Sequence, residues 1–132
     1  MTYNAPVNQI TDTLNDIARI DDLAATGGFP NFDGDLIAPI LDEANKLARD
    51  VLSPLNPIGH KHGVKLTDAG VVSAPGFSDA YARFREGGWM GLAFPEEFGG
   101  QGLPKAMALA VMEMMHASNM AFALCPLLTF GA

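Results

Sequence analysis

Apolar residues recur every three or four positions along two stretches in the first half of the chain, and this spacing predicts two amphipathic helices. In the first stretch the apolar positions are Val7, Ile10, Leu14, Ile17 and Ala18. In the second stretch they are Leu36, Ile37, Ile40, Leu41, Ala44, Leu47, Ala48 and Val51. Charged residues lie between the apolar positions of the second stretch, so one face of this helix is expected to be buried.

Local signals indicate where these helices begin and break. Asn8 is a candidate N-cap of the first helix, and the glycine-rich residues 25–31 are expected to break any helix. Asp33 or Asp35 is the candidate cap of the second helix. Pro39 lies a little inside that helix, so we expect its first turn to be distorted.

The middle of the chain shows weaker patterns. Prolines within residues 53–57 are expected to end the second helix. Residues 57–74 are predicted to form a glycine-rich loop with a short β-like piece at residues 70–72. A third helix is expected to begin at Pro75 or Gly76 and to end at two consecutive glycines. Its inward-facing side chains are expected to be Phe77, Tyr81 and Phe84.

From Pro104 onward the chain is apolar on nearly every side, which is typical of a central core helix or a membrane span. Polar residues interrupt the run, so no clean stretch of about 18 residues is present. We therefore expect two buried helices with a break near residues 118–119, and a membrane span remains the alternative. The chain stops directly after its most hydrophobic stretch, and this end is expected to be a cut through a longer protein.

Composition changes the picture in two ways. The hydrophobic fraction is 48% and the charged fraction is 17%, below the roughly 25% of an average soluble domain. This balance indicates apolar surface intended for another domain or subunit. The formal net charge is −7 and the basic residues are scattered, so nucleic-acid binding is excluded as an expected function.

Other features bear on the cellular compartment. The single cysteine, Cys125, excludes an intramolecular disulfide and fits a reducing compartment. Residues 1–6 lack the basic and apolar regions of a signal peptide. We therefore predict a cytoplasmic protein, and we expect Cys125 to be an inert buried thiol among its apolar neighbours.

Two groups of residues could carry chemistry in a loop. Residues 99–102 form a glycine cluster ahead of a helix, which could cradle a phosphate or form a structural turn with positive φ angles. The turn is favoured because no buried strand precedes the cluster. Glu96 and Glu97 are adjacent carboxylates, and a solvated turn or helix start is favoured over an acid–base pair.

The remaining titratable residues give no catalytic constellation. Glu113 lies within an apolar helix, so it is expected to be partly buried and paired with a cation, or to face a domain boundary. His60 and His62 lie in an expected loop, and with His116 they make no recognisable metal-ligand spacing, so no metal is predicted.

Residues 88–104 read Gly88-Trp89-Met90-Gly91-Leu92-Ala93-Phe94-Pro95-Glu96-Glu97-Phe98-Gly99-Gly100-Gln101-Gly102-Leu103-Pro104. This stretch resembles the signature of acyl-CoA dehydrogenase N-terminal domains. Phe98 stands where tyrosine is common in that family. The order of the surrounding elements agrees along the whole chain. The extra N-terminal helix is similar to that of the longer bacterial members, including those acting on methylthiopropionyl-CoA.

The resemblance implies a fold and an organisation. The fold would be all-α, the N-terminal helical domain of acyl-CoA dehydrogenases, with about five helices and a glycine-rich loop. Residues 1–32 would form an N-terminal helix and linker, and residues 33–132 the helical domain, truncated at its C-terminal end. Complete enzymes of the family add a middle β-domain and a C-terminal helical bundle.

The resemblance also implies an activity in fatty acid metabolism for the complete enzyme. FAD lies mainly between the two missing domains and a neighbouring subunit, and a glutamate from the C-terminal part removes the α-proton of the acyl-CoA thioester. The β-hydrogen leaves as hydride to the flavin, and electrons pass to an electron-transferring flavoprotein. We therefore expect no catalytic residue in this chain, no FAD binding by the chain alone, and a homo-oligomeric enzyme.

The resemblance also implies that this chain carries part of the acyl pocket. The positions concerned are Phe122, Ala123, Leu124, Leu127, Leu128 and Thr129. Their apolar character would exclude water from the thioester. Packing against another domain is the alternative for the same residues. A stand-alone helical interaction module without catalysis is the alternative function for the chain as a whole.

Overall fold

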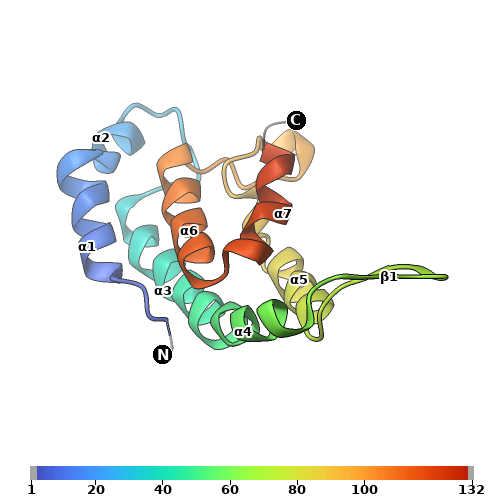
Figure 1. Cartoon of the computed structure of the whole chain (residues 1–132). Coiled ribbons are helices and arrows are strands. Elements are labelled where there is room, and N and C mark those ends of the chain that lie inside the picture. The colour runs from blue at the N-terminus through green and yellow to red at the C-terminus, as the bar shows by residue number, and fades with distance from the viewer. Residues whose placement is uncertain (1–2, 131–132) are drawn as a thin grey trace.

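The computed structural model describes residues 3–130, and these residues form a helical domain with one small hairpin (Figure 1). The elements are α1 (Val7–Asp12) with a π-helical turn (Thr13–Ile17), α2 (Ile20–Ala25), α3 (Ile37–Leu47), a π-helical turn (Ala48–Leu52), α4 (Ser53–His62), β1 (Lys65–Thr67), β2 (Gly70–Val72), α5 (Phe77–Glu86), α6 (Lys105–Ser118) and α7 (Met120–Phe130). Short 3-10 turns occupy Gly34–Leu36, Trp89–Gly91 and Glu96–Phe98. The expected all-helical fold is confirmed.

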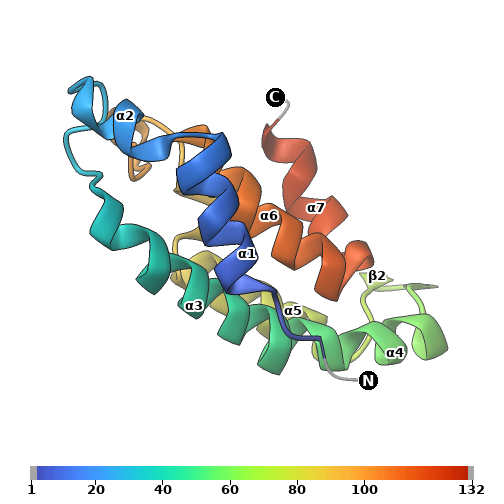
Figure 2. The same ribbon diagram turned by 90° about the vertical axis from the view of Figure 1, so that its left-hand side faces the viewer.

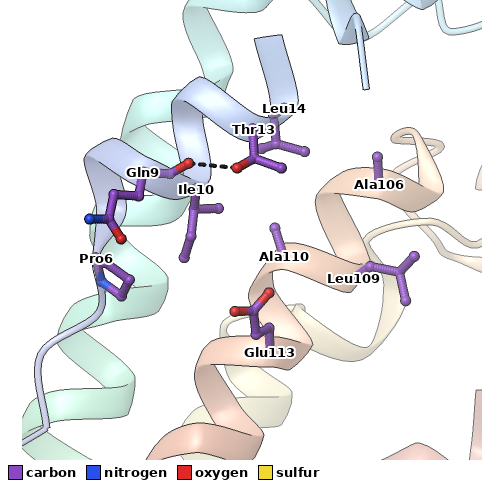
Figure 3. A pocket seen from close by; sticks show the side chains of 9 residues that line it. All are labelled: Pro6, Gln9, Ile10, Thr13, Leu14, Ala106, Leu109, Ala110 and Glu113. Atoms are coloured by element: carbon purple, nitrogen blue, oxygen red, sulfur yellow. Dashed lines mark hydrogen bonds between the residues drawn. The ribbon is translucent and has the colours of Figure 1, made fainter. Parts of the chain in front are cut away.

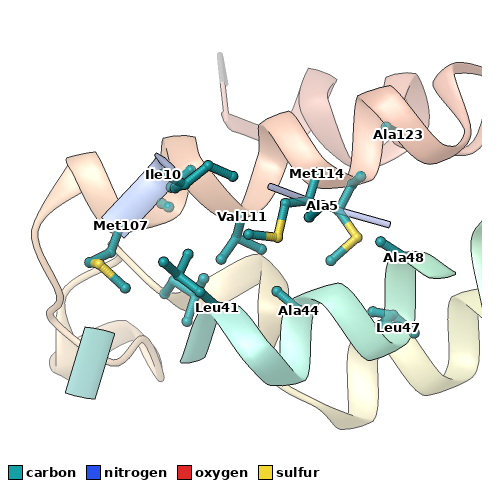
Figure 4. Close-up of a cluster of buried hydrophobic side chains, with 14 of the residues drawn as sticks. Ala5, Ile10, Leu41, Ala44, Leu47, Ala48, Met107, Val111, Met114 and Ala123 are labelled. Atoms are coloured by element: carbon teal, nitrogen blue, oxygen red, sulfur yellow. The ribbon is translucent and has the colours of Figure 1, made fainter. Parts of the chain in front are cut away.

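Helix α6 is the central element of the domain. It packs against α3 and α7, and α1 packs against α3 on the side that also faces α6 (Figures 1 and 2). Met107, Val111 and Met114 project from α6 into the core and are fully buried. They meet the apolar face of α3 and of the π-helical turn that follows it, where the buried residues include Leu41, Ala44, Leu47 and Ala48 (Figure 4). The predicted buried stripe of α3 and the predicted core role of α6 are therefore both confirmed.

The long helix does not end at residues 53–57, so that prediction is wrong. α3 continues through the π-helical turn into α4, which contains Pro54 in its first turn and Pro57 in its interior. A proline inside an α-helix lacks a donor, and its ring clashes with the carbonyl four residues earlier. In the π-helical turn before Pro54, Ser53 N–H donates to the Ala48 carbonyl, five residues earlier. This bond shifts the hydrogen-bond register of the helix by one residue, and the helix continues from α3 into α4.

The N-terminal helices share the core of the rest of the domain. Ile10, Leu14 and Ile20 belong to the same buried cluster as the residues of α3 and α6. Asn8 is not a cap, because α1 begins at Val7 after Pro6. The helix breaks at Arg19, whose φ is +50°, and Ile17 beside this break is exposed rather than inward. The boundary expected between residues 32 and 33 stays a prediction.

The second predicted helix has the expected start. The Asp33 carboxylate accepts a bond from Asp35 N–H at 3.0 Å, which caps the 3-10 turn preceding α3. Pro39 falls in the first turn of α3, where a backbone donor has no intrahelical partner in any case.

The predicted β-like piece is β2, which pairs antiparallel with β1 and places Leu66 opposite Val71. α5 begins after Gly76, as expected. Phe84 is fully buried, and its ring lies 5.7 Å from that of Phe122 in an edge-to-face arrangement. Tyr81 is exposed, so the expectation that it points inward is wrong: it lies at the open edge of the aromatic cluster.

Asn119 separates the last two helices, as predicted, but the expectation that both helices are buried is wrong for α7, which exposes Leu124, Leu127 and Leu128. Its backbone is extended, with φ −157° and ψ 90°. The fully buried side chain donates from Nδ2 to the Leu52 carbonyl at 3.0 Å, and its Oδ1 accepts from Phe122 N–H at 3.1 Å. One amide therefore ties the start of α7 to the long helix. Within residues 3–130 no helix is long and apolar enough to cross a membrane.

Candidate functional site

The glycine cluster closes the signature loop, which we define as residues 88–104. Five consecutive backbone N–H groups, from residue 99 to residue 103, donate to carbonyls within this loop. Gly99 and Gly102 have φ angles of +80° and +64°. The predicted structural turn is confirmed. The donors that a phosphate would need are already used, so this loop is no phosphate cradle.

Gly100 lies at the closest approach of the loop to itself. A Cβ atom on Gly100 would lie 2.0 Å from the Phe94 carbonyl oxygen. That carbonyl accepts the Gly102 N–H at 3.0 Å. The backbone can approach the Phe94 carbonyl this closely because Gly100 has no side chain.

Glu96 and Glu97 lie in the 3-10 turn of the signature loop and are exposed, as expected for a solvated turn. The Glu96 carboxylate accepts a hydrogen bond from Asn31 Nδ2. This contact joins the signature loop to the glycine-rich segment that precedes α3.

An apolar cavity of about 580 Å³ lies beside the signature loop. The loop supplies one wall, α6 the second and α7 the third. The lining residues are Ala93, Phe94, Pro95, Lys105, Ala108, Leu109, Met112 and Leu127. Lys105 is the one charged residue of this lining, and it is exposed. The volume and the apolar walls are those of a small-ligand site.

The six predicted pocket residues all lie on α7, but they do not lie together. Leu127 lines the 580 Å³ cavity. Phe122 is buried and lines a second cavity of about 430 Å³ between α5 and α7, and Ala123 is fully buried in the core. Leu124, Leu128 and Thr129 are exposed. A helix turns by about 100° per residue, so consecutive residues cannot share one face.

The sequence prediction missed most of the residues that line the 580 Å³ cavity. The signature loop contributes Ala93, Phe94 and Pro95, and α6 contributes Ala108 and Met112. The spacing of Ala108 and Met112 places them on one side of α6, and this spacing was the available signal. Nothing in the sequence indicated which side of α6 would meet the loop.

A groove of about 380 Å³ runs between α1 and α6 next to this cavity, and Leu109 lines both (Figure 3). The apolar lining residues are Pro6, Ile10, Leu14, Ala106, Leu109 and Ala110, and the polar ones are Gln9, Thr13 and Glu113. Glu113 is exposed, and none of the three ion pairs formed within residues 3–130 involves it. The alternative of a partly buried, cation-paired Glu113 is therefore wrong within residues 3–130, and the alternative that Glu113 faces a domain boundary stays a prediction.

The Glu113 carboxylate at this groove affects the ionisation of Tyr3. Burial raises the pKa of the Tyr3 phenol above its usual 10.0, and the Glu113 carboxylate raises it further. Both effects disfavour the phenolate, the first through lost hydration and the second through like charge.

The histidines and the cysteine differ in setting from the sequence expectation. His60 and His62 lie in the last turn of α4, not in a loop. Nδ1 of His116 lies 2.7 Å from the Met112 carbonyl oxygen. The described residues contain no group of three or more His, Cys, Asp or Glu side chains placed to hold a metal. Cys125 is exposed, not buried, because it lies on the open side of α7.

Comparison with known proteins agrees with the fold. The chain is 35% identical over its full 132 residues to a 3-methylmercaptopropionyl-CoA dehydrogenase from Ruegeria pomeroyi. The chain spans only 22% of the length of that relative. The model of the family described as "Acyl-CoA dehydrogenase, N-terminal domain" matches residues 40–131. The chain therefore belongs to the acyl-CoA dehydrogenase family, whose N-terminal domain it contains.

Proposed function

We propose that this chain is the N-terminal part of a flavin-dependent enzyme that oxidises an acyl-CoA thioester between its α and β carbons. Its own contribution is one wall of the acyl pocket together with contacts to other subunits. The observation that carries the proposal is the apolar cavity formed by the signature loop, α6 and α7. The family of the chain supports the reaction class.

The cavity suits the acyl part of the substrate. Its walls are aliphatic or aromatic side chains, with Met112 as an adaptable thioether and Leu127 as the contribution of α7. Apolar walls hold an acyl chain by removing its surface from water, at about 25 cal/mol per Å². Excluding water also protects a reactive thioester during oxidation. Lys105 at the solvent-exposed part of the lining would favour an anionic group of the CoA portion nearby.

The signature loop does not fit a flavin dinucleotide by itself. Free backbone donors at a glycine-rich turn can hold a dinucleotide pyrophosphate, but this loop uses its five consecutive donors internally. No step of the reaction is therefore assigned to this chain. FAD in the proposed enzyme would be held by parts of the polypeptide outside these residues, and the purified 132-residue chain is expected to be colourless and inactive on acyl-CoA.

A stand-alone helical interaction module remains the second candidate, because α7 exposes Leu124 and Leu128 on one side. The complete reading frame separates the two candidates. Continuation beyond residue 132 into a β-rich segment supports the enzyme, and a stop codon at that point supports the module.

The pocket is tested in the protein that the complete reading frame encodes. Leu127→Trp fills the cavity from the α7 side, so kcat/KM should fall at least about tenfold more for the longest accepted acyl-CoA than for the shortest. Met120→Trp is the matched control, because Met120 is an exposed residue of the same helix that lies outside the cavity lining. An equal loss for all chain lengths, or an equal effect of both variants, would contradict the role of Leu127.

A further inference from the structure

Two neighbouring spaces beside α6 share one residue. The 580 Å³ cavity lies between α6, α7 and the signature loop, and the 380 Å³ groove lies between α6 and α1. Among the described residues, Leu109 is the one that belongs to both linings. Its side chain is 70% exposed, so it lies at the boundary of the two spaces and not in the core.

The other groove residues of α6 next to Leu109 are small. α6 contributes Ala106 and Ala110 to the groove lining, and Ala110 lies between Leu109 and Ile10 of α1 (Figure 3). An alanine side chain is a single methyl group, so neither alanine fills the space between the two helices. Leu109 is therefore the bulky aliphatic side chain that α6 places at the boundary.

The groove suits an alkyl group. Six of the nine residues that line it are apolar, and an alkyl group that enters such a space loses contact with water, which is favourable. One polar lining group already has a partner: the Thr13 hydroxyl donates to the Gln9 carbonyl at 2.8 Å. An alkyl group that enters the groove leaves this hydrogen bond in place.

The far wall of the groove comes from the N-terminal part of the chain. Ile10 of α1 and Leu14 of the π-helical turn after it line the groove opposite α6. The matched family model begins at residue 40, so both residues lie outside it. The groove therefore depends on a helix outside the region that the family model describes.

We propose that Leu109 closes the acyl cavity against the groove between α1 and α6, and thereby sets the longest acyl group that the complete enzyme accepts. This inference rests on the proposed function, because it assigns an end wall to the acyl cavity of that proposal. A smaller side chain at position 109 would join the two spaces. The distal methylene groups of a longer acyl group would then lie in the groove, between the alanines of α6 and the apolar residues of α1.

The test uses the protein that the complete reading frame encodes, with its cofactor bound, and saturated acyl-CoA thioesters of increasing length. The readout is the ratio of kcat/KM for an acyl group just longer than those normally accepted to kcat/KM for the shortest substrate. Leu109→Ala should raise this ratio at least about tenfold, because added methylene groups then enter an apolar space. Leu109 is mostly exposed, so its truncation leaves no void in the core.

A double variant separates access to the groove from simple enlargement of the cavity. Ala106 lines the groove but not the cavity, and it is half-buried. Ala106→Phe combined with Leu109→Ala should return the ratio to within about threefold of that of the unaltered enzyme, because the ring occupies the space that the acyl group would enter. Enlargement of the cavity alone predicts no such reversal.

Leu66→Ala is the matched control, because Leu66 is an 84% exposed leucine on β1 that belongs to neither lining. It should leave the ratio unchanged. An unchanged ratio in Leu109→Ala, or a gain that persists in the double variant, would overturn the inference. If Leu127→Trp still shows its length-dependent loss in that case, the proposed function stands while the inference fails. If Leu127→Trp shows no such loss, the proposed acyl pocket fails as well.

Discussion

Replacing Gly100 by alanine tests whether the signature loop is held by close contact rather than by backbone conformation. The added Cβ would lie 2.0 Å from the Phe94 carbonyl oxygen and 2.4 Å from the carbonyl carbon. Both are backbone atoms, so no side chain can rotate away to relieve the contact. The loop has to open between residues 94 and 100.

The magnitude follows from what the opening breaks. The Phe94 carbonyl accepts from Gly102 N–H at 3.0 Å, and Gly100 N–H donates to the Pro95 carbonyl at 3.1 Å. Losing both bonds costs about 1 kcal/mol each, and overpacking adds about 1–3 kcal/mol. We therefore expect Gly100→Ala to lower the free energy of unfolding by roughly 3–5 kcal/mol.

Urea unfolding followed by circular dichroism measures this loss, and the amide resonances of Gly102 and Leu103 report on the loop directly. Gly99→Ala is the control in the same loop: its φ is +80°, but a Cβ there meets no atom within 4 Å. Only conformational strain of roughly 1–2 kcal/mol is expected. If Gly100→Ala is no less stable than Gly99→Ala, close contact at Gly100 does not hold the loop.

Two further predictions concern a buried amide and a phenol. Asn119→Ala should lower the free energy of unfolding by roughly 2–4 kcal/mol in urea titrations. The reason is that the Leu52 carbonyl and the Phe122 N–H both lose their hydrogen-bond partner. A loss below about 0.5 kcal/mol would contradict this role. The raised pKa of Tyr3 means that its folded state holds the proton more tightly, so the associated stability is present below about pH 10 and is lost as the pH rises through the folded-state pKa. Ultraviolet titration should give a Tyr3 pKa above the usual value, and Glu113→Gln should bring this pKa closer to the usual value. Tyr3→Phe should remove this part of the alkaline loss of stability. An unchanged Tyr3 pKa in Glu113→Gln would rule out the carboxylate as a cause.

Apolar periodicity determined much of the helical framework. The stripe from Ile37 to Ala48 and the uniformly apolar run after Pro104 identified the two helices that build the core. Burial of apolar surface follows this pattern whatever the detailed packing, because it depends on which face is apolar. The break at Asn119 and the positive φ angles of Gly99 and Gly102 are also local properties, which the residue types themselves favour.

Tertiary contacts decided what local signals could not. The prolines at 54 and 57 indicate a helix end, yet α3 and α4 form one rod through a π-helical turn, and packing of Leu52 and Leu55 into the core favours its continuation. The sequence also could not show that the signature loop would lie against α6, because that contact joins segments brought together only by folding. The cavity is therefore shared between three elements, and of the residues predicted on α7 only Leu127 lines it.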